Sequence, residues 1–236
     1  MKNKLNLIKC SILSVIFLSF NVYANDINED CNKWYIGFGG GFSKPLAKEI
    51  ENEGSLVKFN SHSSKFYNGF IGYRINEDIS VEFLFDRKAN YPLVPKYNGN
   101  LLNEYKTGVS GKSYMINFVY NLKNIYDFNT FFSLGLGVAE TGFKTVSVKA
   151  PQSQHEIFSI LPDKSKSFSW RVGIGADKYI TESIKLGVSA SMHAIHNVQL
   201  KTKELNTEIF RLENKTYKKT VGVGEIAASV KIDLPF

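Results

Sequence analysis

Hydrophobic and polar residues alternate with a period of two in eight separate stretches of the chain. This period is typical of β-strands, because successive side chains of a strand point to opposite faces of the sheet. The stretch ISVEFLFD at residues 79–86 is the clearest example. The pattern predicts strands over residues 34–43, 64–74, 79–86, 113–122, 129–140, 166–178, 183–193 and 222–236. The expected fold class is therefore all-β.

The connections between these stretches alternate in length. Those after the second, fourth and sixth stretches are short, whereas those after the first, third, fifth and seventh extend over roughly 20 residues or more. Short turns at one end and long loops at the other are typical of an outer-membrane barrel. We therefore expect an eight-stranded antiparallel up-and-down transmembrane β-barrel with four long extracellular loops and three short periplasmic turns.

The two faces of the predicted strands differ in bulk. One face is apolar and bulky, and the other carries many glycines, such as Gly37, Gly135 and Gly173. An eight-stranded barrel has an interior just wide enough for side chains, so the glycine face fits the lumen and the bulky face fits lipid. A soluble barrel of the lipocalin type, with an apolar interior, is the alternative. The loop lengths and the final Phe236 favour the membrane barrel.

The N-terminal region has the features of a secretory signal peptide. Lysines precede a short apolar run, and small residues end at Ala24, so cleavage is expected after that residue. An uncleaved N-terminal helical anchor is the alternative. Residues 25–33 would then form a short periplasmic segment, and residues 34–236 would form the barrel in the bacterial outer membrane.

Cysteine usage excludes an intramolecular disulfide in the mature chain. Of the two cysteines, Cys10 lies within the expected signal peptide and Cys31 remains alone. A lipid attachment at Cys31 is the alternative, but the preceding residues are polar, unlike a lipoprotein signal.

Charged residues fall on the glycine face, inside the expected lumen. An isolated buried ion is costly, so these groups must pair with one another. Asp177 and Lys185 flank one tight turn and should lie close together. The lumen is expected to be closed by ion pairs, and a gate or narrow ion path is the alternative. The residues concerned are Glu82, Arg171, Asp177, Lys185, Glu225 and Lys231.

The stretch GFIGYRINEDISVEF at residues 69–83 resembles the second hairpin of the eight-stranded outer-membrane β-barrel families. These include the OmpA transmembrane domain and the opacity-protein and surface-antigen barrels of Gram-negative bacteria. Glu82 matches an inward glutamate of those families. The resemblance extends over residues 34–236 and implies a surface antigen or adhesin without catalysis or cofactor. The final strand, ending at Phe236, resembles the signal that the barrel-assembly machinery recognises.

Two other functions remain open from the sequence. Some eight-stranded barrels modify lipid A, and one cluster here invites comparison, namely Ser189, Ser191, His193, His196 and Asn197. A serine hydrolase needs an activated nucleophile, and no acid partner is evident beside these residues. A small-solute channel is the other possibility, although eight strands leave little open bore. The spacing of ligating residues predicts no metal.

Aromatic residues near the strand ends are expected to form two interfacial girdles, although strands favour aromatics in any case. The periplasmic girdle would contain Trp34, Tyr73, Tyr179 and Phe236, and the outer girdle Phe42, Phe85, Tyr114 and Trp170.

The chain is basic, with a formal net charge of +7, and the predicted long loops are more basic than the rest. Positive charge outside the membrane would attract lipopolysaccharide phosphates, sulfated glycans or acidic host-surface proteins, whereas nucleic acid is not expected there. A solvated surface that reflects genome composition is the alternative. The loops at residues 88–110 and 194–217 are the most basic. The residues expected to contact a partner are Lys96, Tyr97, Lys106, Lys201, Lys203 and Arg211.

Overall fold

The computed structural model describes residues 33–46, 49–52, 55–59, 63–97, 100–101, 107–149, 156–206 and 211–235. Eight long strands are β1 (Trp34–Pro45), β4 (Ser64–Arg74), β5 (Ile79–Tyr97), β7 (Thr107–Ile125), β8 (Phe128–Phe143), β11 (Lys164–Tyr179), β12 (Ile184–Asn206) and β13 (Arg211–Asp233). Five short strands are β2 (Glu49–Asn52), β3 (Ser55–Phe59), β6 (Asn100–Leu101), β9 (Val146–Lys149) and β10 (Glu156–Ile160). The expected signal peptide, Cys31, Lys106 and Phe236 lie outside the described residues.

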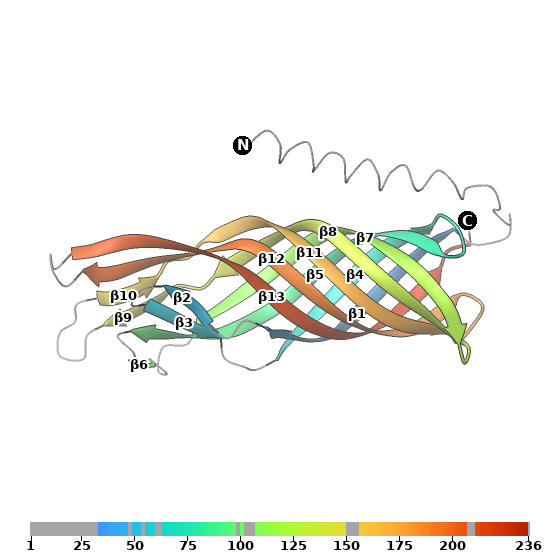
Figure 1. Ribbon diagram of the computed structural model, residues 1–236, viewed down its shortest axis with the longest axis horizontal. Coiled ribbons are helices and arrows are strands. Elements are labelled where there is room, and N and C mark those ends of the chain that lie inside the picture. The colour runs from blue at the N-terminus through green and yellow to red at the C-terminus, as the bar shows by residue number, and fades with distance from the viewer. Residues whose placement is uncertain are drawn as a thin grey trace, which may run out of the picture.

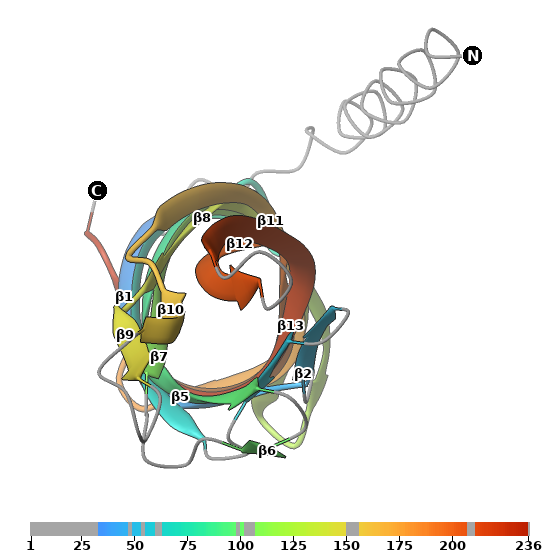
Figure 2. The ribbon, with the colours of Figure 1, turned by 90° about the vertical axis from the view of Figure 1, so that its left-hand side faces the viewer.

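The eight long strands form one closed antiparallel barrel. They pair in the order β11, β8, β7, β5, β4, β1, β13 and β12, and pairing between β11 and β12 closes the ring. Figure 1 shows the tilted strands from the side, and Figure 2 shows the closed ring from one end. The predicted eight-stranded barrel is therefore confirmed. No helix within the described ranges is long and apolar enough to cross a membrane.

The barrel buries the face that the sequence assigned to the lumen. Along β13, Ala227, Lys231 and Asp233 are buried inside, whereas Ile226 and Val230 are exposed on the outer surface. The same division holds on β7, where Met115 and Val119 are buried and Ile116 is exposed. An apolar exterior with a polar interior is the arrangement that a hydrocarbon surrounding requires.

Inward glycines make room for aromatic rings. A Cβ atom added at Gly72 would lie 2.2 Å from a ring atom of Tyr35, and one added at Gly175 would lie 2.4 Å from a ring atom of Phe131. Both approaches are far below van der Waals contact. The glycines therefore let the narrow lumen hold large side chains as well as charges.

Three short turns lie at one end of the barrel, which we call the turn end. In two of them, side-chain oxygens accept backbone N–H groups: Asn76 Oδ1 from Ile79 at 2.7 Å, and Thr181 Oγ1 from Ile184 at 3.1 Å. The third turn consists of Tyr126 and Asp127, with φ values of 48° and 64°. Positive φ at both central residues is the signature of a type I′ hairpin turn. This link is shorter than the six residues expected from the sequence.

At the opposite end, which we call the outer end, the strands continue beyond the predicted boundaries. β5 and β7 extend through much of residues 88–110, and β12 and β13 through much of residues 194–217. The prediction that these segments are loops is therefore wrong over most of their length. The short strands β2, β3, β6, β9 and β10 add further sheet to the outer end, as Figure 1 shows.

Two β-bulges explain why the alternation failed to predict these extensions. On β5 the register shifts between Lys88 and Tyr91, and on β12 it shifts between Ile195 and Val198, where Asn197 has a φ of 53°. Each bulge inserts one extra residue, so the inward positions change parity along the sequence. A period-two pattern is interrupted at such a point, although the strand itself continues.

The two-residue turn gives a test of the hairpin geometry. We expect Tyr126→Asn to be more stable to unfolding than Tyr126→Ile by about 1 kcal/mol, because asparagine tolerates positive φ and a β-branched residue does not. Urea unfolding of the barrel in lipid vesicles measures the difference. Both variants lose the same exposed ring, so equal stability would contradict the assigned turn.

Candidate functional site: the charged lumen and the basic outer end

The ion pairs inside the barrel join equal numbers of carboxylates and cations. They form three groups along the lumen, which we call the rim pair, the inner cluster and the outer cluster. The five carboxylates are Glu82, Asp86, Asp177, Glu225 and Asp233, and the five cations are Arg74, Lys88, Arg171, Lys185 and Lys231. Each group contains as many cations as carboxylates, so no group leaves a net buried charge.

The rim pair closes the lumen at the turn end. The Arg74 guanidinium pairs with the Asp233 carboxylate, whose second oxygen accepts a hydrogen bond from the Tyr179 hydroxyl at 3.0 Å. The guanidinium also lies 5.0 Å from the centre of the Tyr35 ring. Tyr179, expected in the periplasmic girdle, thus directs its hydroxyl to a lumen carboxylate.

The inner cluster lies above the rim pair and is organised by Lys231. Its ammonium lies 3.0 Å from Asp177 Oδ2 and 4.0 Å from Glu82 Oε1, and 4.6 Å from the centre of the Phe131 ring. Lys185 approaches Asp177 at 3.9 Å, so the two residues that flank the turn do lie near each other.

Neutral donors complete the coordination of Glu82 in the inner cluster. The Tyr35 hydroxyl donates to Oε1 at 2.9 Å, and the Asn117 amide donates to Oε2 at 2.7 Å. Because Glu82 is buried, these hydrogen bonds offset the loss of its hydration. Both carboxylate oxygens of Glu82 therefore have hydrogen-bond donors from neighbouring side chains, and Glu82 does not line an open channel.

The outer cluster surrounds Glu225, whose side chain is fully buried. Glu225 Oε1 lies 2.5 Å from Lys88 Nζ, and Oε2 lies 3.0 Å from Arg171 Nη2. The Ser191 hydroxyl bridges the same groups, since it donates to Glu225 Oε2 at 3.1 Å and accepts from Arg171 Nε at 3.0 Å. This cluster spans the lumen, because its members come from β5, β11, β12 and β13.

Lys88 and Asp86 are two lumen residues that the sequence analysis did not assign to an ion pair. Lys88 begins the segment 88–110 that is expected to be a basic loop, and for this residue the expectation is wrong: its side chain is 2% exposed and its ammonium lies 3.2 Å from the Asp86 carboxylate. The continued alternation Glu82, Leu84, Asp86, Lys88 on one face of β5 was the signal that could have revealed it.

Of the serine and histidine residues considered for a hydrolase, Ser191 and His193 lie in the lumen beside the outer cluster. His193 is fully buried, and its Nδ1 lies 3.7 Å from Glu225 Oε1 and 3.8 Å from Asp86 Oδ2. These carboxylates are the acid neighbours that the sequence did not reveal. The hydroxyl of Ser191, however, donates to Glu225 and not to the imidazole. Among the described residues no group of three His, Cys, Asp or Glu could hold a metal ion.

His196 lies elsewhere, on the outer surface at the β12 bulge. Trp170 Nε1 donates to its Nε2 at 3.0 Å, its Nδ1 lies 3.1 Å from Thr220 Oγ1, and its ring stacks on Phe168. Trp170 is thereby fixed near the outer end, where the outer girdle was expected. Phe85 and Tyr114 contact each other on the same surface, and Trp34 contacts Tyr73 at the turn end.

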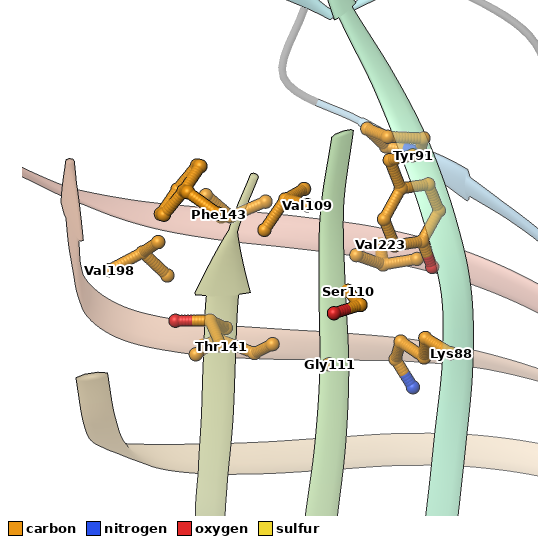
Figure 3. Close-up of a pocket in the computed structure, with 12 residues that line it drawn as sticks. Lys88, Tyr91, Val109, Ser110, Gly111, Thr141, Phe143, Val198 and Val223 are labelled. Atoms are coloured by element: carbon orange, nitrogen blue, oxygen red, sulfur yellow. The ribbon is translucent and has the colours of Figure 1, made fainter. Parts of the chain in front are cut away.

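The outer cluster separates two pockets in the lumen. The inner pocket encloses about 520 Å³ of empty space and is bordered by polar groups, among them Asn117, Arg171 and Lys231. The outer pocket encloses about 420 Å³, including its open mouth, and is largely apolar (Figure 3). Lys88 borders the outer pocket and Arg171 the inner one, so the lumen is interrupted between them by ion pairs.

The six residues expected to contact a partner are distributed over the outer end. Lys96 and Tyr97 lie on β5 and Arg211 lies on β13. The structure does not describe the side chains of these three residues, and Lys106 lies outside the described residues. Lys201 lies on β12, with its ammonium 3.2 Å from Asp163 Oδ2. Lys203 lies two residues further along β12, opposite Ser159 of β10 and Asn214 of β13.

On the outside of the barrel, an apolar row and a charged row lie next to each other. The apolar row joins Phe85, Tyr114, Val138 and Phe168 across β5, β7, β8 and β11. Two residues further toward the outer end, the charged row joins Arg87, Lys112, Glu140 and Lys166 across the same strands. This change marks the outer boundary of the apolar belt.

Comparison with known proteins identifies the family. Residues 10–221 match the family described as the outer membrane protein beta-barrel domain. The chain belongs to this family. It is therefore a protein of the bacterial outer membrane.

Individual relatives agree with this assignment. An uncharacterized protein of Rickettsia prowazekii (strain Madrid E) is 28% identical, over 72% of this chain and 99% of its own length. OprG from Pseudomonas aeruginosa superposes with a TM-score of 0.51 at 13% identity, covering 86% of this chain and 97% of its own. Neisserial surface protein A superposes with a TM-score of 0.50 at 15% identity, covering 85% and 97%. At these identities the two structures establish the fold alone.

The outer cluster gives a test of charge pairing in the lumen. We expect Glu225→Gln to lower the free energy of unfolding by about 3 kcal/mol, because the outer cluster then holds two cations and one carboxylate. Adding Lys88→Met restores the charge balance and should recover most of the loss. Urea unfolding in lipid vesicles measures both variants. If the double variant were no more stable than the single one, the balance of charge would not be the cause.

Proposed function

We propose that this protein is a non-catalytic surface protein whose basic outer end binds anionic partners, in the manner of an adhesin or surface antigen. The observation that carries the proposal is the asymmetry of charge between the two ends of the barrel. Long-range attraction from a surface of one sign raises the local concentration of oppositely charged partners. Salt weakens this attraction, so binding of such a partner is expected to fall as the salt concentration rises.

The outer end has a large excess of positive charge among the side chains that the structure describes. Twelve cations there are exposed or half-buried: Lys44, Lys65, Arg87, Lys112, Lys144, Lys164, Lys166, Lys201, Lys203, Lys215, Lys218 and Lys219. Three carboxylates accompany them: Glu140, Asp163 and Glu213. The turn end has no such excess, since by the same criterion Glu77, Asp78, Asp127 and Glu182 stand against Lys33, Arg74, Lys178 and Lys185. We infer that the short turns face the periplasm, as in other barrels of this type, so the excess lies where a partner outside the cell would meet the protein.

The β12–β13 hairpin is the strongest candidate for a soluble partner. Both strands extend far beyond the barrel ring, as Figure 1 shows, and they pair from Ile184 to Asn206. Lys203, Lys215 and Lys218 lie on this hairpin within a few residues of one another in the pairing register. Cations gathered along a long two-stranded ribbon suit a linear polyanion, and we propose a sulfated glycan as its partner.

The charged row below the hairpin suits a different partner. Arg87, Lys112 and Lys166 stand next to the apolar row Phe85, Tyr114 and Phe168, at the outer edge of the lipid-facing belt. Phosphate groups of lipopolysaccharide lie at that depth, and arginine and lysine bind phosphate strongly. We propose that this row binds the lipid phosphates and thereby fixes the height of the barrel in the membrane.

Two alternative functions receive less support from the geometry. A small-solute channel would need a path through the outer cluster, where Glu225 holds cations from two sides. A lipid A-modifying enzyme would need an activated nucleophile, and Ser191 is engaged by Arg171 and Glu225. For the proposed binding function, a host-surface protein with acidic patches is the alternative to a glycan, because the same lysines would attract it.

The glycan proposal is tested by neutralising the hairpin. We expect the triple variant Lys203→Gln, Lys215→Gln and Lys218→Gln to bind heparin roughly tenfold more weakly at low salt, on the basis of about 0.5 kcal/mol for each exposed charge. Binding to barrels in lipid nanodiscs, measured over a range of salt concentrations, gives the result. The control variant Lys33→Gln with Lys178→Gln changes charge at the turn end and should bind normally. Equal loss in both variants would reject the hairpin as the site.

The lipid proposal needs a separate measurement. We expect barrels with Arg87→Gln, Lys112→Gln and Lys166→Gln to retain several-fold less lipopolysaccharide after extraction and washing, because three phosphate partners are removed. Phosphate analysis of the purified protein measures the retained lipid. The hairpin triple variant is the matched control, since it removes as much charge above the membrane. Unchanged retention in the row variant would remove this proposal and leave the glycan proposal intact.

A further inference from the structure

The outer pocket is largely apolar, whereas the lumen below it is polar. Tyr91, Val109, Phe143, Val198 and Val223 point into the pocket from β5, β7, β8, β12 and β13, as Figure 3 shows. Apolar walls on five strands surround a single space at the outer mouth of the barrel. A barrel interior that needed only to be closed would not require an open apolar chamber above its ion pairs.

The two bulges bring Tyr91 and Val198 into this apolar wall. On β5 the inward positions run through Asp86 and Lys88 and then shift to Tyr91, and on β12 they run through His193 and Ile195 and then shift to Val198. Both shifts occur at the level of the pocket. Local changes of strand twist and direction at bulges are common beside functional sites, because they redirect side chains.

Three polar side chains that line the pocket, Lys88, Tyr91 and Thr141, already have partners. Lys88 at its base pairs with Asp86 and Glu225. The Tyr91 hydroxyl lies 2.6 Å from Ser43 Oγ, and burial raises the pKa of this phenol, so it remains a neutral hydrogen-bonding group. Thr141 Oγ1 lies 2.8 Å from Ser165 Oγ. The pocket therefore offers a ligand apolar contact without an unpaired charge or a free polar group at its base.

Gly111 leaves part of the pocket open. A Cβ atom added at this inward glycine would meet only one atom within 4 Å, the carbonyl oxygen of Glu140 at 3.8 Å. The glycines in the narrow lumen below behave differently, since a Cβ atom at Gly137 would lie 2.1 Å from the Tyr114 carbonyl oxygen. Gly111 is thus not required for close packing, and its missing side chain enlarges the chamber.

We propose that the outer pocket binds a small uncharged apolar molecule, an alkyl or aromatic hydrocarbon group, at the mouth of the barrel. Apolar cavities in proteins remain dry and bind such molecules. The site is independent of the basic surface proposed to bind anionic partners, because its own charges are paired internally. Its occupant enters from the outer side and stops at the Lys88–Glu225 pair.

The experiment uses the whole barrel in lipid nanodiscs and toluene as the probe. Methyl NMR of labelled valine and isoleucine should show saturable shifts at Val109, Val198 and Val223. Toluene also dissolves in the bilayer, so the lipid-facing methyl groups of Val188 and Ile226, which are exposed on the barrel exterior, report that background. Shifts at the pocket methyl groups that are no larger or no more saturable than this background would overturn the proposal.

Filling the pocket gives the matched comparison. Gly111→Leu should weaken toluene binding at the pocket methyl groups at least tenfold. Gly142→Leu on the outward face of β8 is the control and should bind as the natural protein does; a Cβ atom there has contacts no closer than 3.8 Å. Val109→Phe is a second filling variant, and heat-modifiable migration on gels verifies that each variant forms a closed barrel. Unchanged binding in both filled variants would show that toluene occupies another place and would reject the site.

Discussion

The closed ladder of backbone hydrogen bonds is the constraint on which the rest of this structure depends. Within hydrocarbon every backbone N–H and C=O must find a partner in the protein, and pairing of β11 with β12 satisfies this requirement by removing the last free edges of the ring. Closure with eight strands makes the bore narrow. A narrow bore in turn obliges the interior to be filled, which explains why large rings stand opposite glycines and why each buried charge has an opposite charge beside it.

The outside of the molecule is divided into zones that match its surroundings. The apolar belt ends at the row containing Phe85 and Tyr114, and the charged row containing Arg87 and Lys112 follows immediately. Beyond it the strands rise as a basic sheet into the medium. The same strands thus cross lipid, meet the headgroups and reach solvent without changing their secondary structure. This continuity allows the rigid barrel to hold the outer sheet in a defined orientation.

The sequence predicted the number of strands, their two faces and the inward position of residues such as Glu82 and Lys231, because alternation records which face a side chain takes. It did not predict which charges meet. Contacts such as Lys88 with Glu225 join β5 to β13, and they depend on the register around the whole ring. The extended strands and the outer pocket were also missed, since bulges at Lys88–Tyr91 and Ile195–Val198 interrupt the alternation that predicts strands.

The bulge on β12 changes which positions along the strand face inward. Inward residues before it have odd numbers, such as His193 and Ile195, and inward residues after it have even numbers, such as Val198 and Leu200. Loss of Asn197 would remove the extra residue and leave Leu200 inward on a regular strand, whereas loss of Gln199, beyond the bulge, would turn Leu200 outward and Lys201 inward. Beyond the bulge, residues of β12 can therefore be inserted or removed only in pairs if its apolar side chains are to remain on the inner face. An odd change in length would exchange the inward and outward faces of the sheet at the outer end of the barrel.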